Sequence, residues 1–264
     1  MALGDIIKLF QGAGMDAMMP KTVLLLLYFV IFEAGAEASQ PLFPNSVASN
    51  DLEFIRTDDN SVFCCLTYKG TSRAEMPDKR NDELFVNGAF IYLARYEDGS
   101  SVELWAHPDL GSPSLAKKHV EPVANAIGKL PSFMRSKLNH VVIHRGDESA
   151  FGESEGHFFV LYSDNIQTRI DNHDLEETVF HESVHATLDS KYRRSSAWRN
   201  AQRDDNAFIT QYAANNPNKE DMAESALFAW AALVHPGRLP HQVETQVRQL
   251  IPNRLAFFKG LFIP

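Results

Sequence analysis

Asp174-Leu-Glu-Glu-Thr-Val-Phe-His-Glu-Ser-Val-His-Ala-Thr-Leu-Asp189 is the stretch that decides the fold, and its pattern is typical of a helix. No Pro or Gly interrupts it, and apolar side chains recur at helical spacing. Asp174 is a good N-cap residue, and Glu177, three positions later, is its expected capping-box partner. We interpret Asp189 as a surface residue of the last turn. A helix is therefore predicted over residues 174–189.

Two histidines of this helix, His181 and His185, stand four residues apart. Residues at that spacing project from one helix face, about 6 Å apart along the axis. Two neutral imidazoles placed in this way can bind one tetrahedral Zn²⁺, and Glu182 then stands beside the metal, where it can act on a bound water. This H-E-x-x-H pattern is the signature of zinc peptidases. A catalytic zinc needs three protein ligands, so a third must come from elsewhere in the chain.

The third ligand is expected from a later acidic pair. A third histidine in the pattern H-E-x-x-H-x-x-G-x-x-H is excluded, because Leu188 occupies the glycine position and Lys191 the histidine position. Downstream, Glu220 and Glu224 are again four residues apart, at the start of an Ala-rich apolar segment. One carboxylate can bind the metal while the other accepts the outer N–H of a ligating imidazole. Glu220 is also explained as a first-turn acid favoured by the helix dipole, in which case Glu224 is the ligand.

H-E-x-x-H followed by E-D-x-A-E resembles the gluzincin zinc metallopeptidases of the lethal-factor and Pro-Pro-endopeptidase group, over residues 140–235. The resemblance implies that Glu220 binds zinc and that Glu224 supports a ligand histidine. It also implies that the hydroxyl of Tyr212, in the segment before Glu220, faces the reacting carbonyl; simple packing is the other explanation of this tyrosine. Thermolysin looks like a more distant relative, since residues 181–189 match its H-E-x-x-H-A-x-x-D run, but its N-E-x-x-S-D motif is missing.

Composition limits the possible partners. The chain has 264 residues, of which 44% are hydrophobic and 22% charged, as in a folded globular protein. This length allows one domain or two small lobes. The formal net charge is −9, and the short basic run at residues 191–194 is too small for a polyanion-binding surface. We therefore expect no nucleic-acid partner.

Residues 1–38 are predicted to be a signal peptide. Residues 22–32 form an apolar core preceded by Lys21, and Ala36-Glu37-Ala38 gives a small-x-small cleavage pattern. The apolar core is shorter than the ~20 residues that span a bilayer as a helix. We therefore expect a secreted or periplasmic protein without a stable membrane anchor.

The two cysteines of the chain, Cys64 and Cys65, are adjacent. Neighbouring residues on a strand point to opposite faces, so a disulfide between them would be strained. We expect buried thiols, with an oxidised pair as the alternative.

Local patterns predict the remaining elements. Strands are expected over residues 61–68, 84–96, 101–106, 138–144 and 157–163, which are rich in β-branched and aromatic residues. Glu97-Asp-Gly-Ser100 is expected to close a hairpin, and the polar residues 69–82 are expected to form a loop. Further helices are predicted over residues 114–135 with a break near Pro131, around 197–213, over 218–234 and within 242–259.

This order of elements suggests an α+β, zincin-like metalloprotease fold, with a small mixed β-sheet, an active-site helix and a helical C-terminal lobe. We expect a β-rich N-terminal region over residues 39–110 and a zincin-like catalytic domain over residues 111–264. In folds of this kind the strand just before the metal helix edges the cleft. Residues 156–163 are therefore predicted to be an edge strand to which a peptide can add, and a plain core strand is the alternative.

The patterns together predict a zinc-dependent metallopeptidase, with an endopeptidase favoured, that hydrolyses a peptide or protein substrate. The expected site consists of the catalytic residues Glu182 and Tyr212, the metal ligands His181, His185 and Glu220, and the supporting carboxylate of Glu224. The alternative is a catalytically inactive zinc-binding interaction module of zincin fold. A zinc hydrolase that acts on something other than peptides is a weaker option.

Overall fold

The computed structural model describes residues 40–47 and 52–263. The predicted signal peptide, residues 1–38, lies outside the described residues. The described residues belong to one compact unit, Ala38–Pro264. Among them, no helix combines the length and the apolar character that crossing a membrane requires.

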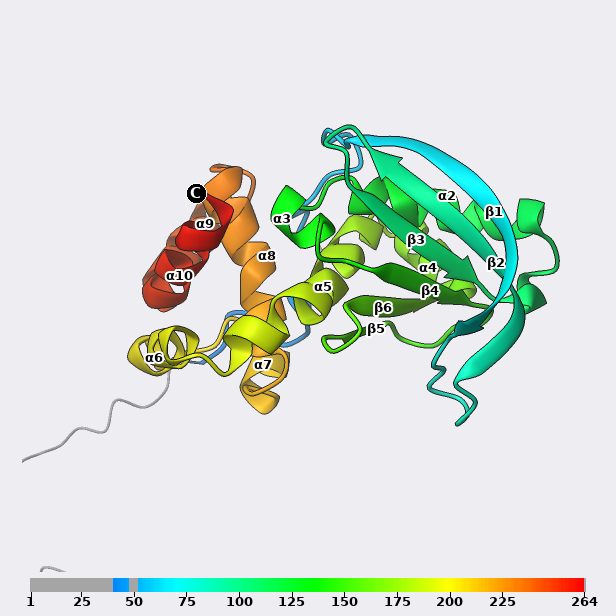
Figure 1. Cartoon of the computed structure of the whole chain (residues 1–264). Coiled ribbons are helices and arrows are strands. Elements are labelled where there is room, and N and C mark those ends of the chain that lie inside the picture. Colours follow the sequence, from blue (N-terminus) through cyan, green and yellow to red (C-terminus); the bar gives the residue numbers. More distant parts are fainter. Residues whose placement is uncertain (1–39, 48–51, 264) are drawn as a thin grey trace, which may run out of the picture. The chain divides into compact units, whose positions relative to one another are not determined.

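One open mixed sheet of six strands has the order β1-β2-β3-β4-β6-β5 (Figure 1). The strands are β1 (Phe63–Glu75), β2 (Phe85–Tyr96), β3 (Ser101–Ala106), β4 (His140–His144), β5 (Phe151–Glu153) and β6 (Phe158–Tyr162). β1, β2 and β3 form an antiparallel meander, β3, β4 and β6 are parallel, and β5 is antiparallel to β6. The predicted α+β class with a mixed sheet is confirmed. Strands from both sides of residue 110 share this sheet.

The hairpin of β2 and β3 forms as the sequence predicts. The Tyr96 backbone N–H donates to the Ser100 carbonyl, and Gly99 adopts a φ of 82°, which favours glycine. The Asp98 carboxylate accepts hydrogen bonds from the backbone N–H and the hydroxyl of Ser100, at 3.1 and 2.6 Å. Local hydrogen bonds therefore set the register of this hairpin.

β1 is longer than predicted. Residues 69–82 are predicted to form a loop, but β1 continues to Glu75, so this prediction is wrong for its first half. β1 lies at one edge of the sheet, where polar side chains can face solvent. Register shifts in its pairing with β2 also break the alternation that marks a strand in sequence.

The position of β1 at the edge of the sheet also explains the exposure of the two cysteines. Cys64 is exposed, Cys65 is half-buried and both are free, so the prediction of buried thiols is wrong. Their Sγ atoms lie 3.1 Å apart, next to the first register shift of the strand.

β5 forms the other edge of the sheet. The sequence predicts residues 156–163 as the edge strand, but β6 pairs with β4 on one side and with β5 on the other, so this prediction is wrong. β5 has only 3 residues and lies in an acidic segment that contains Gly. A strand of this length gives no periodicity that a sequence could display.

Three helices of this part of the chain pack on one face of the sheet, namely α2 (Pro113–Ile127), α4 (Ser163–Asp171) and α5 (Leu175–Thr187) (Figure 1). The short α3 (Ser132–Arg135) packs against α5. The Ser112 hydroxyl accepts a hydrogen bond from the Leu115 backbone N–H and so caps α2. The break predicted near Pro131 is confirmed, because α3 begins directly after it.

The C-terminal helices are shorter and more numerous than predicted. They are α6 (Ser196–Asp205), α7 (Gln211–Asn215), α8 (Asp221–Val234), α9 (His241–Leu250) and α10 (Pro252–Phe262). The single helices predicted around 197–213 and within 242–259 are wrong. Asn206 ends α6 in a left-handed conformation with φ of 47°, and Pro252 starts α10 because it has no N–H with which to continue α9.

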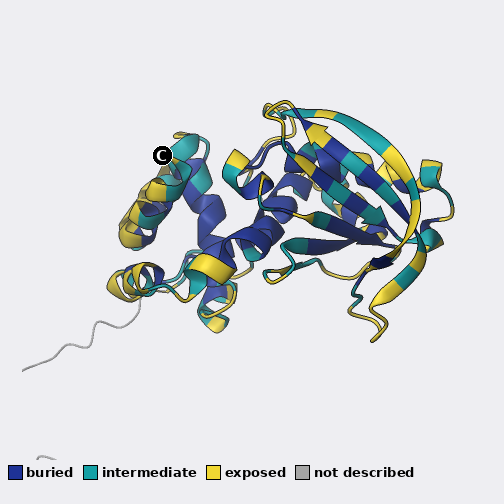
Figure 2. Cartoon of the chain, in the orientation of Figure 1, coloured by how far each residue is buried: buried dark blue, intermediate teal, exposed yellow. Residues whose placement is uncertain are grey.

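The main core lies between the sheet and the helices, and α5 and α8 are buried along most of their length (Figure 2). A smaller apolar cluster lies on the other face of the sheet and includes Val142, Val160 and Tyr162. Trp105 and Phe158 pack against this smaller cluster and are only partly buried. The sheet is therefore well covered on the helix side and only partly covered on its outer face.

Candidate metal centre

Tertiary contacts, rather than a local cap, fix the start of α5. Asp174 is the N-cap residue, but its side chain makes no capping hydrogen bond and instead accepts one from Arg169 Nη1 at 2.8 Å. Glu177 Oε1 accepts a hydrogen bond from the Phe54 backbone N–H at 2.7 Å. Burial raises the pKa of Glu177 to about 8. The predicted capping box is therefore wrong, and both carboxyl groups tie α5 to neighbouring segments.

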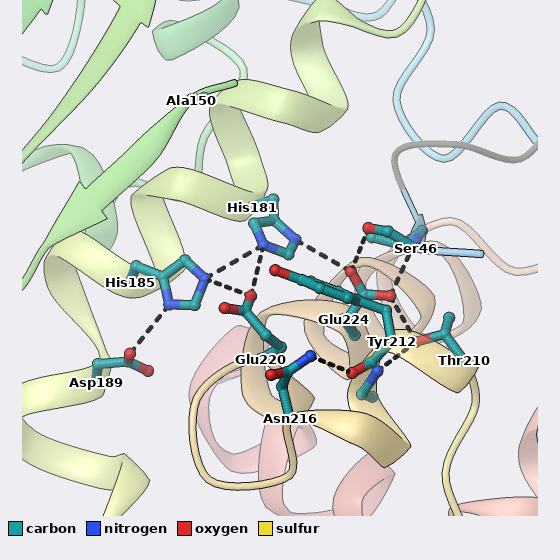
Figure 3. A network of polar contacts seen from close by, with 12 residues as sticks. Ser46, Ala150, His181, His185, Asp189, Thr210, Tyr212, Asn216, Glu220 and Glu224 are labelled. Carbon is teal, nitrogen blue, oxygen red and sulfur yellow. Dashed lines mark hydrogen bonds and ion pairs between the residues drawn. The ribbon is translucent and has the colours of Figure 1, made fainter. Parts of the chain in front are cut away.

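Three possible ligand atoms converge at one place (Figure 3). The Nε2 atoms of His181 and His185 are 3.2 Å apart, and Glu220 Oε2 lies 3.4 and 3.2 Å from them. The imidazoles come from successive turns of α5, and Glu220 is the residue just before α8. This largely buried group could hold a metal ion.

The spacing of these atoms fits a metal ion. In a tetrahedral site with ligand bonds of about 2.0–2.1 Å, neighbouring ligand atoms lie about 3.3 Å apart. The three separations here are 3.2, 3.2 and 3.4 Å. A carboxylate oxygen cannot donate a hydrogen bond, and two facing lone pairs repel each other unless a cation or a proton lies between them. The donor set therefore suits a divalent cation.

The Asp189 and Glu220 carboxylates also favour a proton on His185. Burial lowers the pKa of His185, but hydrogen bonds with Asp189 and Glu220 outweigh burial and raise this pKa to about 10. Burial raises the pKa of Glu220, but hydrogen bonds with His181 and His185 hold it well below its usual range. A metal ion and protons therefore compete for this group.

Asp189 orients one of the imidazoles. Its Oδ2 lies 3.0 Å from His185 Nδ1, so Nδ1 carries the proton and the lone pair of Nε2 faces the cluster. Arg193 donates to the same oxygen at 3.2 Å. The interpretation of Asp189 as a surface residue is wrong, because it is 5% exposed. Its place in the H-E-x-x-H-A-x-x-D run was the signal, since a residue four after His185 continues the same helix face.

Glu224 lies behind the other imidazole and is fully buried (Figure 3). Its Oε1 is 3.6 Å from His181 Nδ1 and accepts a hydrogen bond from the Ser46 hydroxyl at 2.6 Å. Its Oε2 accepts hydrogen bonds from the Val47 backbone N–H at 2.8 Å and from the Thr210 hydroxyl at 2.7 Å. Protein donors thus hold both oxygens of Glu224.

The sequence leaves open whether Glu220 or Glu224 is the metal ligand. The structure places these two acids in different surroundings. Glu220 presents an oxygen to both Nε2 atoms, whereas Glu224 faces the outer nitrogen of His181. Ser46 and Thr210 donate hydrogen bonds to Glu224. The sequence does not predict them as site residues, because isolated hydroxyl residues from distant segments form no motif.

Glu182 and Tyr212 line the same cleft as the three ligands. Glu182 is 8% exposed, and its Oε2 has no hydrogen-bond partner within the described residues. A buried oxygen of this kind is costly unless a bound molecule satisfies it. Tyr212 is 39% exposed, and its ring lies beside Glu220 (Figure 3). Burial and the charge of Glu220 raise the pKa of Tyr212 to about 12, so its hydroxyl keeps the proton.

The cleft around this group has a volume of about 550 Å³, and β5 forms one of its walls. Gly152 packs so closely on α5 that a Cβ there would lie 2.6 Å from the Glu182 carbonyl oxygen and from His185 Cβ. His157 supports this contact, because its Nδ1 donates to the Ala186 carbonyl at 2.7 Å. The absence of a side chain at Gly152 thus brings the free edge of β5 to the mouth of the cleft.

Comparison of the chain with protein-family models, with curated proteins and with solved structures found no match. The interpretation of the site therefore rests on its geometry. The structure gathers all six residues that the sequence singled out, namely His181, Glu182, His185, Tyr212, Glu220 and Glu224. It adds Asp189, Ser46 and Thr210 to them.

Proposed function

We propose that this chain is a secreted or periplasmic zinc-dependent metallopeptidase of zincin-like fold, in which His181, His185 and Glu220 hold the zinc ion. The observation that carries the proposal is the convergence of three ligand atoms to within 3.4 Å of one another, beside a carboxylate with an unsatisfied buried oxygen. A simple buried ion pair needs neither the second imidazole nor that carboxylate. The close contact of an edge strand with the helix that bears the histidines supports the zincin-like fold.

Zinc is the ion that this donor set favours. Two imidazoles and one carboxylate leave one tetrahedral position open, which is the arrangement of catalytic zinc sites. Ca²⁺ and Mg²⁺ prefer sites made of oxygen alone. Cys64 and Cys65 lie on β1, at the sheet edge opposite β5, so the proposed set contains no thiolate.

The residues around the ligands have separate tasks in peptide hydrolysis. When bound, the zinc ion supplies Lewis-acid chemistry that lowers the pKa of a water molecule toward ~7. Glu182 takes the proton from the attacking water at its free oxygen and passes it to the leaving amine. Tyr212 keeps its hydroxyl proton and donates a hydrogen bond to the oxygen on which negative charge develops. Asp189 holds the His185 imidazole in place, and the buried Glu224 carboxylate stands 3.6 Å from the outer nitrogen of His181.

An extended peptide is the substrate class that the cleft suits. β5 has a free edge, and its residues line the cleft. A peptide can add to such an edge as a further strand, held by main-chain hydrogen bonds. Because Gly152 lies against α5, the added strand runs close to the ligand atoms. This endopeptidase-like arrangement recognises the backbone of a protein chain rather than a small molecule.

Replacement of Glu182 tests the proposal. The Glu182→Gln chain should retain about one zinc ion, because Glu182 is not a ligand. It should lose at least about 100-fold in peptide turnover, because a neutral amide cannot accept the proton from water. Zinc is measured by mass spectrometry of the dialysed protein, and turnover by mass spectrometry of a proteome-derived peptide library. Asp58→Asn, an exposed substitution outside the cleft, is the control and should change neither quantity.

Two other outcomes of this experiment would contradict parts of the proposal. Turnover that survives in the zinc-loaded Glu182→Gln chain would remove Glu182 from the mechanism. A library that the zinc-loaded unmodified chain leaves intact would contradict the peptidase. That result would favour a zinc-binding interaction module of the same fold.

A further inference from the structure

A second cavity lies on the outer face of the sheet. This groove has a volume of about 380 Å³, and its floor includes Trp105, His140 and Phe158, which come from the adjacent strands β3, β4 and β6. Phe151 and Glu153 of β5 line both this groove and the metal cleft. The two cavities therefore meet at the edge strand β5, which is labelled below β6 in Figure 1.

The floor of the groove is a stack of rings that carries no charge at neutral pH. The ring centroids of Trp105 and His140 are 3.7 Å apart with planes 15° from parallel, and those of His140 and Phe158 are 4.8 Å apart at 11°. Burial lowers the pKa of His140 to about 4. The Trp105 Nε1–H donates to Glu103 at 2.8 Å, so this donor is already satisfied. The ring faces thus offer surface on which an aliphatic chain can pack, although His140 Nε2 is buried without a hydrogen-bond partner among the described residues.

The rim of the groove is acidic. Glu75, Glu153 and Glu155 line it, and all three are exposed. No Lys or Arg is among the described residues that line the groove, and within the described part of the chain these three carboxylates have no hydrogen bond or ion pair. Lys79 lies over the Phe151 ring, but its ammonium donates to Ser149 and Ala150, so the carboxylates around one groove favour a further bound cation. An apolar floor with an acidic rim matches a side chain that has an aliphatic stem and a positive end.

We propose that this groove is a subsite for an arginine or lysine side chain of an extended peptide that lies along β5. In β5 the position of Gly152 faces α5, whereas its neighbours Phe151 and Glu153 face the groove, as strand alternation requires. A strand added to the free edge of β5 has the same alternation, so side chains on one of its faces reach the groove. The stem of the basic residue packs on Phe151 and Phe158, the rings nearest the free edge, and its charge meets the carboxylates of the rim. The inference rests on the proposed function for the identity of the peptide as a substrate, but binding requires no hydrolysis.

Peptide binding to the Glu182→Gln chain tests this subsite directly. The probes are short fluorescein-labelled peptides of Ala and Ser with a single arginine, which is moved through every position. Citrulline at the same position is the neutral control of equal shape. In fluorescence anisotropy at low salt, arginine at alternate positions should strengthen binding about fivefold relative to citrulline, since exposed charge pairs contribute only modestly.

Substitutions in the rim locate the effect. Glu75→Gln together with Glu155→Gln should remove most of the preference for arginine; Glu153 is left unchanged because it also lines the metal cleft. Glu121→Gln, on α2 at the opposite face of the sheet, is the matched control and should leave the preference intact.

The outcomes separate this subsite from the proposed peptidase. Equal affinity for the arginine and citrulline peptides at all positions contradicts the subsite. An arginine preference that survives the double substitution contradicts it as well. If the rim-dependent preference is found but the zinc-loaded unmodified chain hydrolyses no peptide, the subsite stands and the peptidase falls.

Discussion

At the scale of residues, each imidazole of the candidate metal centre has a carboxylate on its outer side. The acid that serves His185 is local, because Asp189 follows it by one helical turn. The acid that approaches His181 is distant, because Glu224 belongs to α8. A proton on the outer nitrogen leaves the inner lone pair free for a metal ion. Asp189 therefore fixes this proton on His185, whereas the outer nitrogen of His181 lies 3.6 Å from Glu224 and has no hydrogen-bond partner among the described residues.

Asp189→Asn should weaken zinc binding about tenfold or more. The amide oxygen can still accept a hydrogen bond from His185 Nδ1, but it lacks the negative charge that makes the bond strong and that balances the metal ion. Zinc affinity is measured by competition with a chromophoric chelator at neutral pH. Asp58→Asn is the exposed control of the same chemistry. An affinity equal to that of the control would show that Asp189 does not prepare His185 for the metal.

Part of the candidate metal centre can be identified from the sequence, because helix spacing alone brings two of its residues together. His181 and His185 are brought together by helix periodicity alone, so their spacing is enough. Glu220 and Glu224 share that spacing, and only the donors around Glu224 show which acid is enclosed. Those donors come from separate parts of the chain, so no local pattern contains them. The convergence of the predicted ligands could be foreseen, but the distinction between the two acids could not.

At the scale of elements, the contact between β5 and α5 decides the shape of the cleft. Long periodic elements such as α2, α8 and the β2–β3 hairpin are predictable, because their patterns repeat several times. β5 is too short for a pattern, and the polar half of β1 resembles a loop because it lies at an exposed edge. The capping box predicted at the start of α5 does not form, because Asp174 and Glu177 accept hydrogen bonds from other segments of the chain.

Gly152→Ala should lower the free energy of unfolding by about 1–3 kcal/mol. The new Cβ would lie 2.6 Å from the Glu182 carbonyl oxygen and from His185 Cβ, and neither atom is the end of a flexible side chain. β5 must then move away from α5, so zinc affinity should fall too. Urea unfolding measures the first effect and chelator competition the second.

Gly260→Ala in α10 is the matched control for this substitution. Nothing lies within 4 Å of a Cβ added there, and Ala favours a helix more than Gly does. Stability should be unchanged or slightly higher. If both substitutions had the same effect, the close contact of β5 with α5 would be refuted.

At the scale of the whole molecule, a buried charge network connects the C-terminal helix to the segment that bears Glu220, one of the candidate metal ligands. Arg254 of α10 lies 3.0 Å from Asp221 and 3.2 Å from Asp205, and all three side chains are fully buried. Burial raises the pKa of Asp221 despite this pairing. Asp221 directly follows Glu220 in the chain, so the network holds the start of α8 in place. The sequence gives no sign of it, because exposed ion pairs use the same residue types.

Arg254→Met should lower the free energy of unfolding by about 3–5 kcal/mol, because it leaves two buried carboxylates without a counter-charge. Arg203→Met removes an exposed ion pair with Asp204 and should cost at most about 1 kcal/mol. Urea unfolding of both variants at neutral pH provides the comparison. A loss in Arg254→Met no larger than in the control would show that the network does not hold the C-terminal helices together.

Zinc K-edge X-ray absorption of the purified, zinc-reconstituted chain tests the central claim most directly. We predict about one zinc per chain, with only nitrogen and oxygen ligands at about 2.0–2.1 Å and the signature of two imidazoles. Glu220→Gln should lose this ion, whereas Glu224→Gln should retain it with lower affinity. Failure to retain zinc, or a spectrum dominated by sulfur from Cys64 and Cys65, would contradict the proposed centre.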